Sequence, residues 1–231
     1  MEVLKFGETK VEDGSLVYAL FLHGFPSIRS RQNRDIAEAT ARETGGRADV
    51  LLYDGLGFSP GVFSFERCLS DVRAFVKNLV ESGVEKFDLV GHSWGGFLSL
   101  VLASEYRKQI RRLVLMSPLL SFTTAEHARP WFEETFADNP NIRLGNIGQL
   151  ATEFERLGKK YPLQNLLSKF PETIDALFLQ AENDAVTPLS VAQSSLAFFH
   201  KTPLFEMADT DHSFLINRTA MTDRIARFIA R

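Results

Sequence analysis

The segment Gly91-His92-Ser93-Trp94-Gly95-Gly96 is the most informative part of this 231-residue chain. It follows the short apolar run Phe87–Val90 and precedes a helical pattern over Phe97–Tyr106. Glycines flanking a serine between a strand and a helix are typical of a sharp turn that presents the serine hydroxyl, since larger side chains there would collide with neighbouring backbone. The positive end of the following helix favours negative charge at this turn. An ordinary glycine-rich turn is the alternative, but the context favours Ser93 as a nucleophile.

A serine nucleophile needs a base, and three histidines follow Ser93 in the sequence. A serine hydroxyl reacts poorly at neutral pH unless a histidine accepts its proton and a carboxylate orients that histidine. His127 lies in a predicted helical segment, and we place His200 at the end of a helix. His212 instead follows the last predicted strand, Leu204–Met207. Because active sites of open α/β sheets lie at the carboxyl ends of strands, we predict His212 as the base.

The loop after the predicted strand Ala176–Gln180 supplies the candidate acids, Asp184 and Glu182. Asp211 is a third carboxylate, but it directly precedes His212 and we expect its side chain to point elsewhere. An acid held by a separate strand orients the imidazole ring better. The serine, acid, histidine order is also the one that a serine turn of this kind uses. We therefore predict Asp184 as the acid, with Glu182 second.

Acyl transfer also requires two N–H groups that stabilise an oxyanion, and two loops offer them. One donor is usually the amide after the serine, here Trp94, and the other follows an earlier strand. The segment after Leu16–Leu22 contains Gly24, which lets the backbone approach closely, and Phe25, which would donate its N–H. We interpret His23 as a residue that braces this loop and not as a base.

Short apolar runs alternate with amphipathic stretches along most of the chain. The runs lack polar alternation, as expected for strands covered by helices on both faces. Such alternation implies a mostly parallel sheet with right-handed crossovers. The predicted strands are Leu16–Leu22, Ala48–Tyr53, Phe87–Val90, Leu113–Met116, Ala176–Gln180 and Leu204–Met207, and the predicted helices are Asp35–Glu43, Phe65–Val80, Phe97–Tyr106 and Ala220–Ile229.

The segment from Leu120 to Phe170 breaks this alternation, because it holds no convincing strand. Two helical patterns, over His127–Ala137 and Ile147–Leu157, fit there instead. We interpret residues 120–170 as a small helical lid inserted into a single α/β domain that spans residues 1–231. Its aromatic side chains are consistent with the roof of an apolar pocket, or with ordinary core packing.

Composition excludes several other classes of protein. The 26 basic and 29 acidic side chains give a net charge of −3 without an extended basic run, so we expect no nucleic-acid partner. Cys68 is the only cysteine, which precludes an internal disulfide, and no metal-type spacing of Cys and His occurs. We expect neither metal nor cofactor.

The chain shows no sequence signal for a membrane. No apolar run approaches the roughly 20 residues that span a bilayer, and Met1–Lys5 does not lead into the apolar core of a signal peptide. We expect a soluble cytoplasmic protein without a membrane partner.

Taken together, these motifs resemble the α/β-hydrolase superfamily, and they occur in its order over nearly the whole chain outside the lid. The resemblance implies an α/β-hydrolase fold with a serine, aspartate and histidine triad. Family members usually have two strands before the strand of the oxyanion loop, whereas Val3–Val11 has room for about one, so we expect about seven strands. The matching pieces are His23-Gly24-Phe25, Tyr53–Ser59, Gly91–Gly96, Asp184 with Thr187-Pro188, and Asp211-His212.

Within the superfamily, the segment Ser59–Phe65 followed by Asp71-Val72 is similar to small carboxylesterases, including cinnamoyl and feruloyl esterases. The Trp94 turn also resembles proline iminopeptidases. Those enzymes usually carry His-Gly-Gly-Pro-Gly at the oxyanion loop, where this chain has His23-Gly24-Phe25-Pro26-Ser27, and they have a larger cap. Dehalogenase and epoxide hydrolase relatives use an aspartate at the turn, so Ser93 argues against those reactions.

The sequence therefore predicts a serine hydrolase that cleaves a small-molecule carboxylic ester with a small or aromatic acyl group. Ser93, Asp184 and His212 would form the triad, and the amides of Phe25 and Trp94 the oxyanion hole. Hydrolysis of an amide, thioester or carbon–carbon bond, or a non-catalytic small-molecule receptor on the same fold, are the alternatives. The natural substrate and oligomeric state stay open.

Overall fold

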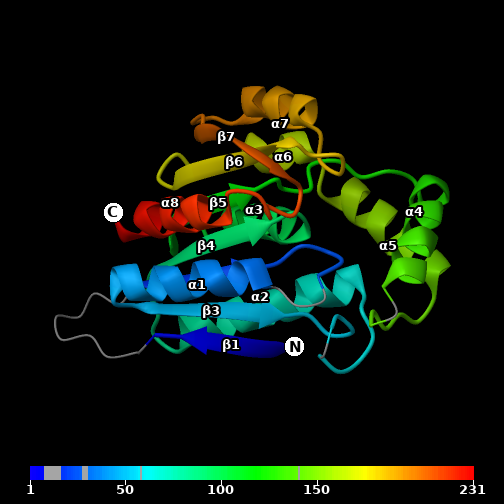
Figure 1. Ribbon diagram of the computed structural model, residues 1–231, viewed down its shortest axis with the longest axis horizontal. Helices are drawn as coiled ribbons and strands as arrows, with labels where there is room; N and C mark the ends of the chain where they lie inside the picture. The colour runs from blue at the N-terminus through cyan, green and yellow to red at the C-terminus, as the bar shows by residue number, and fades with distance from the viewer. Residues whose placement is uncertain (8–16, 28–30, 58, 140) are drawn as a thin grey trace.

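A twisted sheet runs through the protein, flanked by helices on both faces (Figure 1). The computed structural model describes residues 1–7, 17–27, 31–57, 59–139 and 141–231. The seven-stranded sheet found there has the order β1-β3-β2-β4-β5-β6-β7, with β1 antiparallel to β3 and every other pair parallel. The strands are β1 (Glu2–Phe6), β2 (Tyr18–Leu22), β3 (Arg47–Leu52), β4 (Phe87–His92), β5 (Ile110–Met116), β6 (Asp175–Asn183) and β7 (Leu204–Asp211).

This sheet confirms the predicted mostly parallel α/β fold of about seven strands, with one described strand ahead of β2. β1 begins at Glu2, one residue before the span predicted from Val3 to Val11, and otherwise lies within that span. The end of that span and the first residue of the run Leu16–Leu22 lie outside the described residues.

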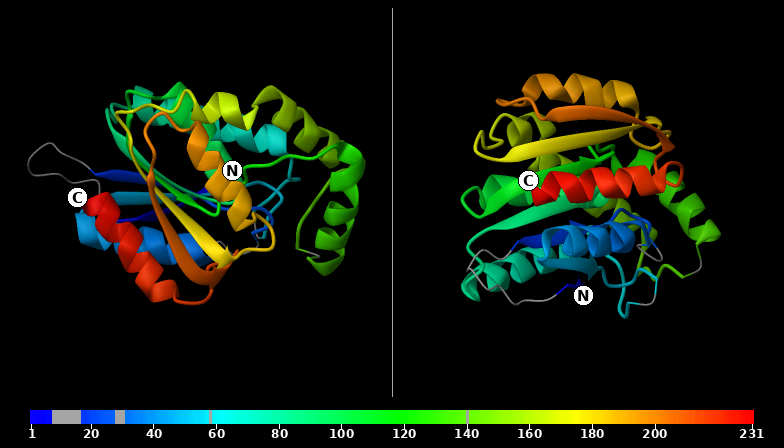
Figure 2. Two further views of the ribbon diagram at one scale, coloured as in Figure 1. Left: turned by 90° about the horizontal axis from the view of Figure 1, so that it is seen from above. Right: turned by 60° about the vertical axis from the view of Figure 1, so that its left-hand side comes forward.

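The strands are uninterrupted apolar runs in the sequence because a layer of helices covers each face of the sheet. Successive strand side chains point to opposite faces, so Leu89 packs with the cluster of α2 and α3, and Val90 with that of α1 and α8. Figure 2 shows α1 and α8 together on one face. The helices outside residues 120–170 are α1 (Arg31–Thr44), α2 (Phe65–Glu81), α3 (Trp94–Glu105), α7 (Leu189–Ser195) with a 3₁₀ turn at Leu196–Phe198, and α8 (Arg218–Ala230).

Between β5 and β6 the chain forms helices α4 (Ala125–Asp138), α5 (Ile147–Lys160) and α6 (Leu163–Leu167). α4 and α5 lie beyond the carboxyl ends of the parallel strands (Figure 1). In the described part of residues 120–170 we find no strand, only an isolated bridge from Leu144 to Phe63.

A buried carboxylate fixes α5 to the start of α2. Glu153 is only 4% exposed, and its Oε2 accepts a 2.8 Å hydrogen bond from the hydroxyl of Ser64. The same hydroxyl accepts from the backbone N–H of Arg67 and so caps α2. One turn further along α5, Arg156 forms a 2.8 Å ion pair with Glu66. α5 is therefore attached to the main body by polar contacts as well as by packing.

Two details differ from the sequence-based predictions. α7 ends at Ser195, and the 3₁₀ turn after it ends at Phe198, so His200 lies beyond the helix that we expected it to end. The short helix α6 was not predicted separately, since five residues are too few for a helical period to show. Within the described ranges, no helix is long and apolar enough to cross a membrane.

Candidate active site

Four parallel strands bring the predicted site residues to one edge of the sheet. β2, β4, β6 and β7 all end there, and the last residues of β6 and β7, Asn183 and Asp211, are register partners. The next residues along the two strands are Asp184 and His212, which are therefore adjacent although 28 positions apart. Ser93 follows β4 at the same edge.

Ser93 occupies a strained turn between β4 and α3. Its backbone angles are φ 53° and ψ −115°, a conformation that residues with side chains rarely adopt. Its N–H donates to the carbonyl of Met116 at 3.0 Å. A Cβ at Gly95 would overlap the carbonyl oxygen of Leu22, and one at Gly91 would overlap Gly95 and Ser99. The flanking positions thus need glycine because backbone passes through the space that a side chain would fill.

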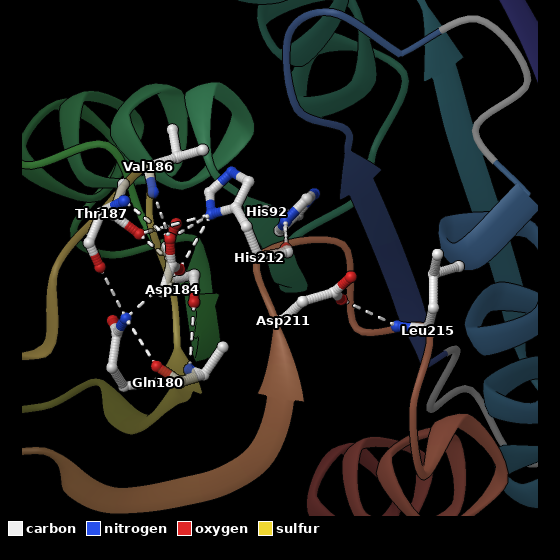
Figure 3. Close-up of polar contacts among 10 residues, drawn as sticks. His92, Gln180, Asp184, Val186, Thr187, Asp211, His212 and Leu215 are labelled. Carbon is white, nitrogen blue, oxygen red and sulfur yellow. Dashed lines mark hydrogen bonds and ion pairs between the residues drawn. The ribbon is translucent and has the colours of Figure 1, made fainter.

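Asp184 and His212 form a close hydrogen-bonded pair (Figure 3). Nδ1 of His212 lies 2.8 Å from Oδ2 and 3.0 Å from Oδ1 of Asp184. A carboxylate only accepts hydrogen bonds, so Nδ1 carries the proton and a neutral ring presents an unprotonated Nε2. The Asp184 side chain is fully buried and that of His212 is 17% exposed.

The loop that carries Asp184 also holds its carboxylate. Oδ1 accepts from the backbone N–H groups of Val186 at 2.9 Å and Thr187 at 2.7 Å. Burial alone would raise the pKa of Asp184, but the hydrogen bonds from His212 and from the Thr187 amide outweigh it and hold the pKa well below its usual range. The carboxylate is therefore ionised throughout the range in which a histidine titrates.

Three supporting residues were not identified as such from the sequence. Thr187 donates from its hydroxyl to Oδ2 of Asp184 at 2.8 Å, and Gln180 donates to the Thr187 carbonyl at 2.8 Å. Ser117, at a positive φ of 36° after β5, accepts from the N–H of Ala181. Only Thr187 had a sequence signal, the Thr-Pro pair after the acid. Ser117 follows β5 and lies 64 positions before its partner Ala181, a distance that no local pattern spans.

Glu182 and the other histidines lie apart from the pair. Glu182 is exposed, whereas Asp184 is buried. His23 is buried and braces its own loop: Nδ1 donates to the Gly24 carbonyl at 2.8 Å, and the ring lies tilted against that of Tyr53, with ring centroids 4.0 Å apart. Burial lowers the pKa of His23 to about 4, so the ring is neutral near pH 7. This geometry agrees with a bracing role.

The loop that contains Phe25 lies against the Ser93 turn. A Cβ added to Gly24 would come within 3.0 Å of the Cβ of Ser93, so this approach requires glycine. Trp94 is the first residue of α3, where backbone N–H groups have no partner within the helix. Both donors predicted for an oxyanion hole are therefore on segments that meet at Ser93.

A cavity of about 480 Å³ opens at Ser93, within the range of small-molecule sites. Its wall is mostly apolar and aromatic, and much of it comes from the segment after β5, from α4 and from α5. His127, which we had placed in the helical segment, lies in this wall and its Nδ1 contacts the hydroxyl of Thr124 at 2.7 Å. The lining residues are Phe25, Phe65, Ser93, Trp94, Leu119, Ser121, Phe122, Thr123, His127, Ala128, Trp131, Phe154, Ala185 and Val186.

Solved structures share this architecture over nearly the whole chain. A monoacylglycerol lipase from Paleococcus ferrophilus superposes with a TM-score of 0.73 at 16% identity, covering 99% of this chain and 98% of that one. Est1E from Butyrivibrio proteoclasticus, a structure with bound ferulic acid, gives a TM-score of 0.72 at 16% identity, covering 98% and 94%. At such identities, these likenesses concern the fold.

Sequence comparison places the chain in a family. A proline iminopeptidase from Lactobacillus delbrueckii subsp. lactis is 30% identical over 122 residues, which are 50% of this chain and 38% of that protein. The chain thus spans less than half of that relative's length. A family model described as the alpha/beta hydrolase fold matches residues 20–149, more than half of the chain. With its sheet, its serine turn and this match, the chain belongs to the α/β-hydrolase family.

Proposed function

We propose that this hydrolase cleaves carboxylic esters of small or aromatic acyl groups through an acyl-enzyme intermediate. The observation that carries the proposal is the hydrogen-bonded pair of Asp184 and His212, at the edge of the sheet where Ser93 opens into an aromatic cavity. A buried, ionised acid, a histidine with its proton on Nδ1 and a serine in a strained turn are the components of acyl transfer.

The steps follow from these positions. Ser93 Oγ attacks the ester carbonyl carbon, and Nε2 of His212 takes the hydroxyl proton. The amides of Phe25 and Trp94 donate to the oxyanion of the tetrahedral intermediate. Collapse of that intermediate breaks the bond to the alcohol oxygen, which receives the proton from His212. Water then repeats the sequence on the acyl-enzyme and releases the acid. Asp184 orients His212 and stabilises its cation, and the scheme needs no metal or cofactor.

We further propose that the chain works as a single α/β domain in which residues 120–170 form a lid over the acyl pocket. Trp131 of α4 and Phe154 of α5 line the same cavity as Ser93. Apolar side chains over the cavity exclude water from part of it and so strengthen the electrostatic interactions beneath them. The bounded cavity favours short or aromatic acyl groups over long lipid chains.

An amide substrate is the second candidate, because the similarity to a proline iminopeptidase covers half of this chain. The oxyanion loop His23-Gly24-Phe25-Pro26 departs from the pattern of those peptidases. Thioesters and carbon–carbon bonds use the same triad and belong in the same assay panel.

A fluorophosphonate probe combined with a substrate panel tests the proposal. We expect the probe to label Ser93 in the wild-type protein, and ester turnover to exceed turnover of matched proline amides and thioesters. Ser93→Ala should fold, resist labelling and lose several powers of ten in rate. A folded Ser93→Ala variant with wild-type turnover contradicts the triad. Labelling without turnover of any panel member indicates a receptor that retains a reactive serine.

A further inference from the structure

We infer that His92 is a positioning residue, whose ring holds the main chain of His212 in register with the Ser93 turn. The inference rests on the proposed function of Ser93 and His212. His92 is the last residue of β4 and directly precedes Ser93, so any contact that it makes is transmitted to the serine through a single peptide bond.

The central contact is a hydrogen bond between positions 120 residues apart. Nε2 of His92 lies 2.8 Å from the carbonyl oxygen of His212, as Figure 3 shows. A carbonyl oxygen accepts only, so Nε2 carries a proton and donates it. His92 therefore fixes the backbone of His212, while Asp184 fixes its ring. These are independent constraints on one side chain.

Packing leaves the His92 ring little freedom. Its centroid is 5.0 Å from that of His212, and Phe214 meets it edge-on at 5.8 Å and 88°. On another side, a Cβ at Gly24 would come within 3.0 Å of Nδ1 of His92. The ring thus lies close to the loop after β2 and contacts the loop after β7, in addition to belonging to its own turn. Three of the loops that form the candidate site meet on this one side chain.

The donor at this position must also be uncharged. Burial, together with the proximity of His212, lowers the pKa of His92 to about 3. The titratable groups that act on the ring are His212, Asp184 and His23, and the last is itself neutral near pH 7. A fixed positive charge at position 92 would repel the His212 cation that forms during proton transfer. A neutral imidazole supplies the N–H without that penalty.

Two substitutions separate the hydrogen bond from the packing. His92→Phe keeps a ring but removes the donor, and His92→Gln keeps a neutral N–H at similar reach. We expect His92→Phe to lower kcat about three- to tenfold with little change in KM, as for the loss of one hydrogen bond. His92→Gln, which keeps a donor, should retain most of the wild-type kcat. Fluorophosphonate labelling of Ser93 should slow in parallel, since it depends on the same proton transfer.

A spectroscopic measurement on the unaltered protein keeps the inference testable if the variants fold poorly. With ¹⁵N-labelled histidine, NMR should show His92 as the Nε2–H tautomer from about pH 6 to pH 8, and a downfield Nδ1–H signal from His212. In His92→Phe, the His212 signal should broaden or shift although Asp184 is intact.

The inference is wrong if His92 is charged or is the Nδ1–H tautomer, or if His92→Phe keeps the wild-type kcat and His212 signal. It is also wrong if the His92→Gln and His92→Phe variants lose activity equally, because this would indicate that His92 acts through packing alone and not through its hydrogen bond. Absence of Ser93 labelling and of turnover in the wild-type protein would instead contradict the proposed function, while the tautomer measurement would still stand.

Discussion

The hydroxyl of Thr187 and Nδ1 of His212 both donate to one oxygen atom, Oδ2 of Asp184, and each does so at 2.8 Å. The second carboxylate oxygen is also occupied, by the amides of Val186 and Thr187. Asp184 therefore has a single orientation available to it, and that orientation sets the plane of the His212 ring.

Removal of the Thr187 hydroxyl should loosen this arrangement. Thr187→Val has nearly the same shape, so it should fold, but we expect kcat for ester hydrolysis to fall about three- to tenfold, the equivalent of one hydrogen bond. Thr187→Ser, which keeps the hydroxyl, is the matched control and should stay near wild type. Equal activity of the valine and serine variants would show that the hydroxyl does not support Asp184.

Two neighbouring carboxylates, Glu182 near the end of β6 and Asp184 just after it, are candidates, and substituting each in turn tests which one is the acid of the triad. Asp184→Asn should leave the fold intact but favour the wrong tautomer of His212, lowering kcat by up to about ten thousand-fold. Glu182→Gln is the control, since Glu182 is exposed, and it should change kcat little. Steady-state kinetics on one activated ester are sufficient. Greater damage from Glu182→Gln would mean that the acid has been assigned to the wrong residue.

Buried neutral histidines make the folded protein sensitive to acid. The pKa of His23 is about 4 and that of His92 about 3 when folded, against 6.5 for an unperturbed histidine. As the pH falls below 6.5, the unfolded chain takes up protons at these positions and the folded protein does not. The stability that these two neutral histidines contribute is therefore present at neutral pH and is lost as the pH falls from about 6.5 to about 4.

Urea unfolding at pH 7 and pH 5 measures this loss. We expect the free energy of unfolding to fall by roughly 2 to 4 kcal/mol between these conditions. His23→Gln should reduce the difference, because it removes one of the two buried groups, although it lowers stability at both pH values. His200, which is exposed, offers the control His200→Gln, which should leave the difference unchanged. A pH-independent free energy in the wild-type protein would contradict the argument.

Trp131 of α4 lines the cavity beside Phe25, with ring centroids 6.2 Å apart, and should limit acyl length. The wild-type enzyme should prefer acetate, butyrate or aromatic p-nitrophenyl esters over palmitate, measured as kcat/KM. Trp131→Ala should move the optimum to longer chains while Ser93 labelling by a small fluorophosphonate stays within about twofold, since lost packing there leaves the triad unaltered.

Phe198→Ala is the control for this experiment, because Phe198 is 39% exposed, like Trp131 at 38%, but does not line the cavity. It should leave the chain-length profile as it is. Preference of the wild-type enzyme for palmitate, or an unchanged profile in Trp131→Ala, would show that this roof does not set substrate size.

The sequence predicted those parts of the molecule that depend on local pattern. The parallel sheet followed from apolar runs such as Phe87–Val90, because burial on both faces removes polar alternation. The positions of Ser93, Asp184 and His212 followed from strand ends. By contrast, the donors and acceptors around them, Ser117 and His92 in particular, depend on contacts between distant strands. Glu153 reads as the polar face of an amphipathic helix, since glutamate is rarely buried unless it is paired, and only the packed structure shows its partner Ser64.

That partner has a consequence for how this protein could acquire new substrates. Oε2 of the buried Glu153 keeps its hydrogen bond from Ser64 only while α5 stays docked on α2, so substitutions at that contact would leave a buried polar atom without its partner and destabilise the segment. Trp131 on α4 holds no buried carboxylate and is 38% exposed, so a smaller side chain there enlarges the cavity that Ser93 lines at a lower cost in stability. Selection or laboratory evolution should therefore change substrate preference through single substitutions on α4. The contacts of α5 with α2 should stay the same.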